Sequence, residues 1–151
     1  MHPKTFKLLW IDDEEENINI LKPAIEQWVI DCSGNTYKLE ILSKRTYDDT
    51  VFGIANDPLV HMIITDLNLL DGKNGAEFIS KIRENEIYKD ILLYSSDSVA
   101  LAEKLKLFDG IHFYSFTDIF ALRDKIQNVV WQCLIREQYV LARHEKKELE
   151  K

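Results

Sequence analysis

The sequence predicts an α/β fold, with a doubly wound sheet of five parallel strands and helices on both faces. Short apolar segments of strand length alternate five times with longer segments whose apolar residues recur every three or four positions. Because crossovers between parallel strands are right-handed, this alternation places helices on both sides of one sheet. With 151 residues, 46% of them hydrophobic and 30% charged, the chain has the size and composition of one globular domain.

The predicted strands are apolar runs that stop at polar or turn residues. The first runs into an acidic cluster, the second alternates polar and apolar residues, and the third is almost entirely apolar, as expected of a strand covered on both faces. The fourth and fifth are shorter, and Asp109-Gly110 precedes the fifth. The strands are predicted at residues 5–11, 37–42, 59–65, 91–94 and 111–114.

The predicted helices carry their apolar residues on one face. The first has acidic residues in its first turn, where the helix dipole favours them, and Pro23 as its weak point. Thr117 and Asp118 offer N-cap side chains to the last helix. The helices are predicted at residues 16–30, 47–55, 75–85, 99–108 and from 119 onward.

The last helix is expected to run past the domain, because the charged tail RHEKKELEK contains no helix breaker. We therefore predict a domain over residues 1–130 and an extension of the last helix over 131–151. Two interpretations stay open: the extension packs on its own domain, or it pairs with another chain, for instance in a homodimer. The heptad-like spacing favours pairing slightly, but it is shorter than a firm coiled coil needs.

Charge and composition exclude several classes of function. A net charge of −7 argues against direct binding of nucleic acid, which calls for basic surfaces. No apolar run is long enough to cross a membrane and no signal peptide is evident, so we expect a cytoplasmic protein. Cys32 and Cys133 are too few and too far apart for a disulfide framework or a CxxC motif.

Polar residues follow three of the predicted strands. Asp12 and Asp13 come after the first strand, Asp66 after the third and Ser95 after the fourth. Ligands bind at the carboxyl ends of such strands, so these side chains are expected at one rim. Three close carboxylates cannot all ionise cheaply, and an all-oxygen set suits Mg²⁺. We predict a Mg²⁺ ion held by Asp13, Asp66 and either water or Asp12, with Asp66 also the nucleophile towards a phosphoryl group that Ser95 would hydrogen-bond.

Neighbouring residues offer competing interpretations. Asp71 also follows apolar residues, but it lies in a turn, whereas Asp66 directly ends its strand. Glu14, Glu15 and Glu16 are expected only to begin a helix. The hydroxyl of Ser95 is almost as well suited to cap the next helix, and Ser96 is the better cap if Ser95 contacts phosphate.

These stretches resemble the receiver domains of bacterial two-component response regulators, which are CheY-like proteins with a flavodoxin-like (βα)₅ fold. The resemblance covers roughly residues 5–130 and rests on LLWIDDEE, IITDLNLLDG and LLYSSDS. Each motif is weak by itself, but their order and their places at strand ends make a specific combination.

The resemblance implies a signalling switch rather than a metabolic enzyme. A sensor histidine kinase or a phosphotransfer protein would donate a phosphoryl group to Asp66 from a phosphohistidine. Output would pass through protein contacts, to a downstream partner or to an output domain fused in a larger protein. Further roles implied are direct ligation of Mg²⁺ by Asp13, ligation through water by Asp12, ligation by the backbone carbonyl of Asn68, a switch hydroxyl on Ser95 and a switch aromatic at Tyr114.

The sequence departs from the family pattern in two places. The family has a Lys at the end of strand five, where Ser115 or Phe116 stands here. The loop from Asp66 to Gly75 is one residue longer than the common form and has Leu70 in place of its usual Pro. We hypothesise that Lys73, in this loop, supplies the missing positive charge.

Two alternative functions stay open. A pseudo-receiver, an interaction or dimerisation module that phosphorylation does not drive, is favoured by the missing Lys and opposed by the complete acidic group. A Mg²⁺-dependent phosphohydrolase with Asp66 as nucleophile ranks well below, because the pattern DxDx[TV] is not met: Asn68 occupies its second acidic position.

Overall fold

The computed structural model describes residues 2–106 and 108–149, apart from the side chains of residues 105, 138–145 and 148. Five strands alternate with five helices as predicted, and a short 3₁₀ turn is added. In chain order the elements are β1 (Lys4–Ile11), α1 (Glu15–Cys32), β2 (Tyr37–Lys44), α2 (Asp49–Asn56), β3 (Val60–Asp66), η1 (Leu70–Gly72), α3 (Gly75–Glu84), β4 (Asp90–Ser95), α4 (Ser98–Leu105), β5 (His112–Ser115) and α5 (Ile119–Leu149).

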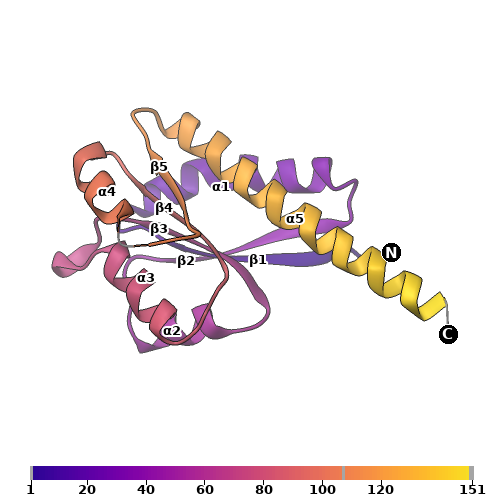
Figure 1. Ribbon diagram of the computed structural model, residues 1–151. Helices are drawn as coiled ribbons and strands as arrows, with labels where there is room; N and C mark the ends of the chain where they lie inside the picture. Colours follow the sequence, from indigo (N-terminus) through magenta and orange to yellow (C-terminus); the bar gives the residue numbers. More distant parts are fainter. Residues whose placement is uncertain (1, 107, 150–151) are drawn as a thin grey trace.

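The strands form one parallel sheet in the order β2-β1-β3-β4-β5, which confirms the predicted fold class (Figure 1). Ile11 of β1 pairs with Thr65 of β3, and Asp66 pairs with Tyr94 of β4. The carboxyl ends of the three central strands therefore lie at the same edge of the sheet. The order in which the strands are added reverses between β1 and β3, because β2 lies on one side of β1 and β3 on the other, and doubly wound folds bind their ligands at such a point.

Two apolar layers cover the sheet. Helices α1 and α5 pack on one face, against Leu8, Trp10 and Tyr94 among others. Helices α2, α3 and α4 pack on the other face, against Leu9, Ile63 and others. Alternate side chains of the central strands enter opposite layers, because successive residues of a strand point to opposite faces. This alternation explains why β3 and β4 are apolar almost throughout.

Pro23 does not end α1, although a proline removes one backbone hydrogen bond from a helix. The residue is exposed, so water can satisfy the carbonyl that loses its partner. Buried residues on both sides of Pro23, Ile18, Leu21, Ile25 and Val29, hold the two halves of α1 on the sheet. Packing of these residues thus outweighs the tendency of proline to end a helix.

Helix α5 begins as predicted, since the Asp118 side chain accepts the Phe120 N–H at 3.0 Å. Its described core residues end at Leu134, and the helix continues past the sheet to Leu149 (Figure 1). The side chain of Val140, an apolar residue of the predicted extension, lies outside the described residues, and the division at residue 130 stays a prediction. No described helix combines the length and apolarity needed to span a membrane.

Candidate functional site

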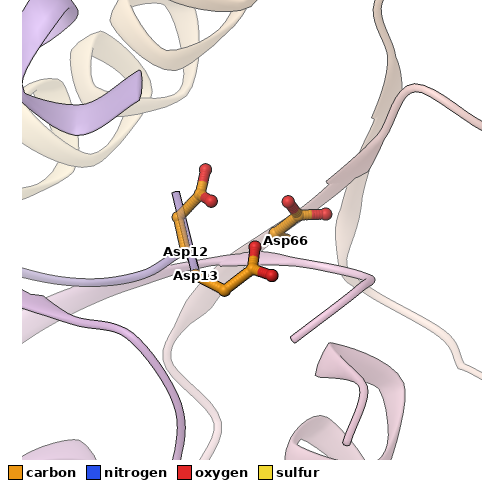
Figure 2. A group of neighbouring side chains, drawn as sticks. All are labelled: Asp12, Asp13 and Asp66. Carbon is orange, nitrogen blue, oxygen red and sulfur yellow. The ribbon is translucent and has the colours of Figure 1, made fainter. Parts of the chain in front are cut away.

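Three aspartates meet at the carboxyl edge of the sheet. Asp12 and Asp13 directly follow β1, and Asp66 is the last residue of the neighbouring strand β3. One carboxylate oxygen from each lies within 4.8 Å of the others, and Figure 2 shows the three side chains around a common space. The convergence predicted from the strand ends is therefore present.

Asp12 is fully buried, and hydrogen bonds hold both of its oxygens. Oδ1 accepts the Glu14 N–H at 2.8 Å, at the start of α1. Oδ2 accepts the hydroxyl of Tyr94 and, more weakly at 3.4 Å, the side-chain amide of Asn17. Burial raises the pKa of Asp12, while the hydrogen bond from Tyr94 opposes that rise. These contacts fix the carboxylate in one orientation.

Asp66 lies half-buried beside Asp12. Burial, followed by the charge of Asp12, raises its pKa to about 7, against a usual value of 3.8. The Asn68 N–H, 3.1 Å from Oδ1, donates a hydrogen bond that lowers the pKa, but this offsets only part of the rise. The folded chain thus holds a carboxylate that is difficult to ionise unless a cation lies beside it.

Asp13 faces an open hollow of about 370 Å³ that the acidic residues Glu14, Glu15 and Glu16 also line. Arg45 is its basic residue, and its Nε–H donates to the Asp13 carbonyl at 3.4 Å. Both glutamates of the first helical turn, Glu15 and Glu16, are exposed, as predicted for residues that only begin a helix. Arg45 was not predicted, because nothing in the sequence shows that the residue after β2 lies beside Asp13.

The donor set fits a hard divalent cation. All three side chains offer oxygen, and Mg²⁺ is bound in proteins by one or two carboxylates plus water and phosphate oxygens. Asp13 and Asp66 are the carboxylates with fewer hydrogen bonds. Asn68 binds Asp66 through its own N–H, so its backbone is placed at the site, and ligation by its carbonyl stays a prediction.

The β3–α3 loop separates Asp66 from the competing Asp71. Asp71 is exposed and has φ of 59°, inside η1, and it is absent from the acidic group. Gly75 begins α3 against the end of β3, where a Cβ would lie 2.4 Å from the Asp66 carbonyl oxygen. Only glycine therefore permits this close approach.

Ser95 ends β4 and is buried. Its Oγ accepts the Asp97 N–H at 3.0 Å, which leaves its own O–H free to donate. The interpretation of Ser96 as the helix cap was wrong: Asp97 is the N-cap and accepts from Val99 and Ala100. Asp97 is the better cap because its carboxylate accepts two backbone N–H groups at once, at 3.1 and 3.0 Å.

The two remaining predicted residues, Lys73 and Tyr114, make contacts with other parts of the chain. The Lys73 ammonium donates to the Tyr47 carbonyl at 2.9 Å and lies 5.0 Å from the centre of the Tyr47 ring. In the described part of the chain, Lys73 forms no ion pair with Asp66. Tyr114 is half-buried in β5 and packs on the layer formed with α1 and α5.

The end of strand five carries no lysine, in agreement with the sequence. Ser115 is exposed, and the Phe116 ring packs edge-on against Tyr94, with centroids 5.7 Å apart. Tyr94, whose hydroxyl reaches Asp12, is the second site residue that was not predicted. A tyrosine in an otherwise aliphatic strand, directly before Ser95, is the signal that identifies it.

Fold and site together define a class: an α/β protein with three aspartates at the carboxyl edge of a five-stranded parallel sheet. No family model and no curated protein sequence matches the chain. Many solved structures of CheY-like response regulator receiver domains share the fold over most of the chain, so the chain has the receiver fold.

One such structure is the phosphorylated cyanobacterial phytochrome response regulator RcpA, with 15% identity, a TM-score of 0.61, and coverage of 83% of this chain and 91% of that chain. A CheY-like receiver domain from Methanospirillum hungatei JF-1 has 17% identity, a TM-score of 0.60, and coverage of 88% and 99%. A de novo designed Rossmann 2x3 fold protein matches at 16% identity and a TM-score of 0.57, covering 83% and 90%. Similarity at this level therefore describes the fold, and the site has to support the function.

Proposed function

We propose that the chain is a signalling switch in which Asp66 accepts a phosphoryl group with the help of Mg²⁺. The observation that carries the proposal is the group of Asp12, Asp13 and Asp66, with one oxygen from each within 4.8 Å. The pKa of about 7 for Asp66 supports it, because burial and the neighbouring carboxylates oppose ionisation of Asp66, and a bound cation would remove that repulsion in a receiver fold.

Each residue of the group has a separate task. Asp13 and Asp66 would ligate Mg²⁺ directly, with the Asn68 carbonyl, and Asp12 would ligate through water, because its oxygens already accept three hydrogen bonds. A Mg²⁺ ion held there would neutralise the charge that otherwise keeps a carboxylate and a phosphoryl donor apart.

Asp66 acts as the nucleophile. One of its oxygens attacks the phosphorus of a phosphohistidine, the P–N bond breaks, and its electron pair stays on the imidazole nitrogen. The product is an acyl phosphate on Asp66. Ser95 donates its free O–H to a phosphoryl oxygen, which requires its hydroxyl to turn towards β3.

The partners follow from this chemistry. The phosphohistidine would belong to a sensor histidine kinase or a phosphotransfer protein. Output would leave through the face formed by β4 and β5, where Tyr114 is half-buried, towards a downstream protein or a fused output domain. The protein would act in the cytoplasm.

A pseudo-receiver is the second candidate, and a specific observation favours it. Phe116 packs on Tyr94 at the end of strand five, and Lys73 is bound to Tyr47. A phosphoryl group on Asp66 would therefore lack the lysine partner that the family provides.

Beryllofluoride, which mimics a phosphoryl group on a carboxylate, separates the candidates. With Mg²⁺ present, the switch predicts shifts in the amide NMR spectrum around Asp66 and Ser95, and none in Asp66→Asn. Asp71→Asn, which changes an exposed acid of the same loop, should respond as the wild type does. An unchanged wild-type spectrum would favour the pseudo-receiver, and repeated turnover of phosphate esters would favour the hydrolase.

A further inference from the structure

A line of buried polar side chains leads from the core to the acidic group. The Trp10 Nε1–H donates to the Tyr94 hydroxyl at 3.0 Å, and that hydroxyl donates to Asp12 Oδ2. All three residues are 0% exposed. Buried polar groups in such a line are costly to leave unpaired, so each contact constrains the next.

Tyr94 spans the sheet to make this contact. It lies on β4, and its backbone is in register with Asp66 of β3, whereas Trp10 lies in β1, one strand further on, and Asp12 directly follows β1. Strands lie about 4.8 Å apart, so only a long side chain crosses β3 to reach β1. The Phe116 ring, 5.7 Å away, holds Tyr94 from the side.

The direction of the hydrogen bond is set by chemistry. The indole N–H of Trp10 can only donate, so the Tyr94 oxygen accepts from it and keeps its own proton for Asp12. Tyr94 is therefore a fixed hydroxyl donor beside the Asp12 carboxylate.

The position of this donor bears on which cation the site takes. Ca²⁺ takes six to eight oxygen ligands in flexible geometry, whereas Mg²⁺ accepts few carboxylates and keeps several waters. With Oδ2 held by Tyr94 and Oδ1 by the Glu14 N–H, Asp12 does not turn freely towards an ion. Two carboxylates, those of Asp13 and Asp66, stay available for direct ligation.

We propose that Tyr94 is a positioning residue that sets the cation preference of the site, by holding Asp12 back from direct ligation and so favouring Mg²⁺ over Ca²⁺. The inference rests on the cation site of the proposed function and is independent of phosphoryl transfer. Release of Asp12 would give a third direct carboxylate and a site better suited to Ca²⁺.

The test compares dissociation constants for Mg²⁺ and Ca²⁺, measured from the amide NMR signals of Asp66 and Asn68. In Tyr94→Phe the preference for Mg²⁺ should fall about tenfold, because Asp12 becomes free to add an oxygen ligand. Asn17→Ala removes the weaker donor to the same oxygen, a half-buried side chain in the first turn of α1, and should shift the preference in the same direction by about twofold to threefold. This second variant decides the question if Tyr94→Phe does not fold.

Tyr37→Phe is the matched control. Tyr37 is buried in the same apolar layer, and its hydroxyl has no hydrogen-bond partner among the described residues. Its removal should leave the ratio of the two constants unchanged. The inference is overturned if both ions bind and neither Tyr94→Phe nor Asn17→Ala changes the ratio. If neither ion perturbs Asp66 in the wild type, the proposed function fails, and the inference fails with it.

Discussion

The side-chain carboxyl group of Asp66 has a pKa of about 7 in this fold, since burial and the charge of Asp12 oppose its ionisation. In an unfolded chain the same group ionises near 3.8. Between these values the folded state binds more protons than the unfolded state. The free energy of unfolding therefore falls as the pH rises from about 4 to about 7 in the absence of Mg²⁺.

Asp66→Asn should remove much of this pH dependence. At pH 8 without Mg²⁺ the variant should be more stable than the wild type by on the order of 2–4 kcal/mol, and Mg²⁺ should reduce the difference by stabilising the wild type. Urea unfolding across the pH range measures this. Asp71→Asn should stay within about 0.5 kcal/mol of the wild type, because Asp71 is exposed. Constant wild-type stability between pH 4 and 7 would contradict the account of Asp66.

Two buried tyrosines should respond to loss of the hydroxyl in different ways. Tyr94→Phe leaves the Trp10 N–H without its partner and removes the stronger of the two hydrogen bonds to Asp12 Oδ2, and should cost about 1.5–3 kcal/mol of stability. Tyr37→Phe removes a buried hydroxyl that has no partner among the described residues, so it should be neutral or slightly stabilising. Equal effects in chemical denaturation would show that the Tyr94 hydrogen bonds contribute little.

The contact between β3 and α3 depends on a missing side chain at the first residue of the helix. In Gly75→Ala the new Cβ would lie 2.4 Å from the Asp66 carbonyl oxygen, so the end of β3 and the start of α3 must separate. We expect a loss of about 1–3 kcal/mol, with a displaced Asp66 and weaker Mg²⁺ binding. Thermal unfolding and Mg²⁺ titration measure the two effects.

Gly53→Ala provides the control for that variant. Gly53 lies inside α2, and no atom would come within 4 Å of its Cβ. Alanine favours a helix interior, so this change should stabilise the chain by roughly 0.5–1 kcal/mol. If both substitutions stabilise the chain, the close approach at Gly75 is not a constraint.

The elements also show what the sequence was able to predict. The spacing of apolar residues was enough to predict five strands alternating with five helices. The acidic residues at the strand ends were enough to predict that Asp12, Asp13 and Asp66 lie together, because parallel strands have their carboxyl ends at one edge of the sheet. Contacts across the sheet were not predictable in the same way. Tyr94 reaches Asp12 over an intervening strand, and neither residue is near the other in sequence.

On the scale of the whole molecule, the first part of α5 packs on the sheet, and the same helix then continues beyond the domain (Figure 1). The described core residues of α5 end at Leu134, and Ile135 and Arg136 are exposed. A chain that ends at residue 137 should therefore unfold within about 0.5 kcal/mol of the full chain. A larger loss would favour the interpretation in which the extension packs on its own domain, and light scattering of both chains would test pairing.

The most direct test of the central claim is whether Asp66 becomes phosphorylated. The chain is incubated with acetyl phosphate and Mg²⁺, and the phosphoryl group is located by mass spectrometry, with Asp66→Asn and Asp71→Asn in parallel. We predict one phosphoryl group on the peptide containing Asp66, present in the wild type and Asp71→Asn, and absent from Asp66→Asn or after Mg²⁺ is chelated. An unmodified wild type, or a phosphoryl group that persists in Asp66→Asn, would contradict the account.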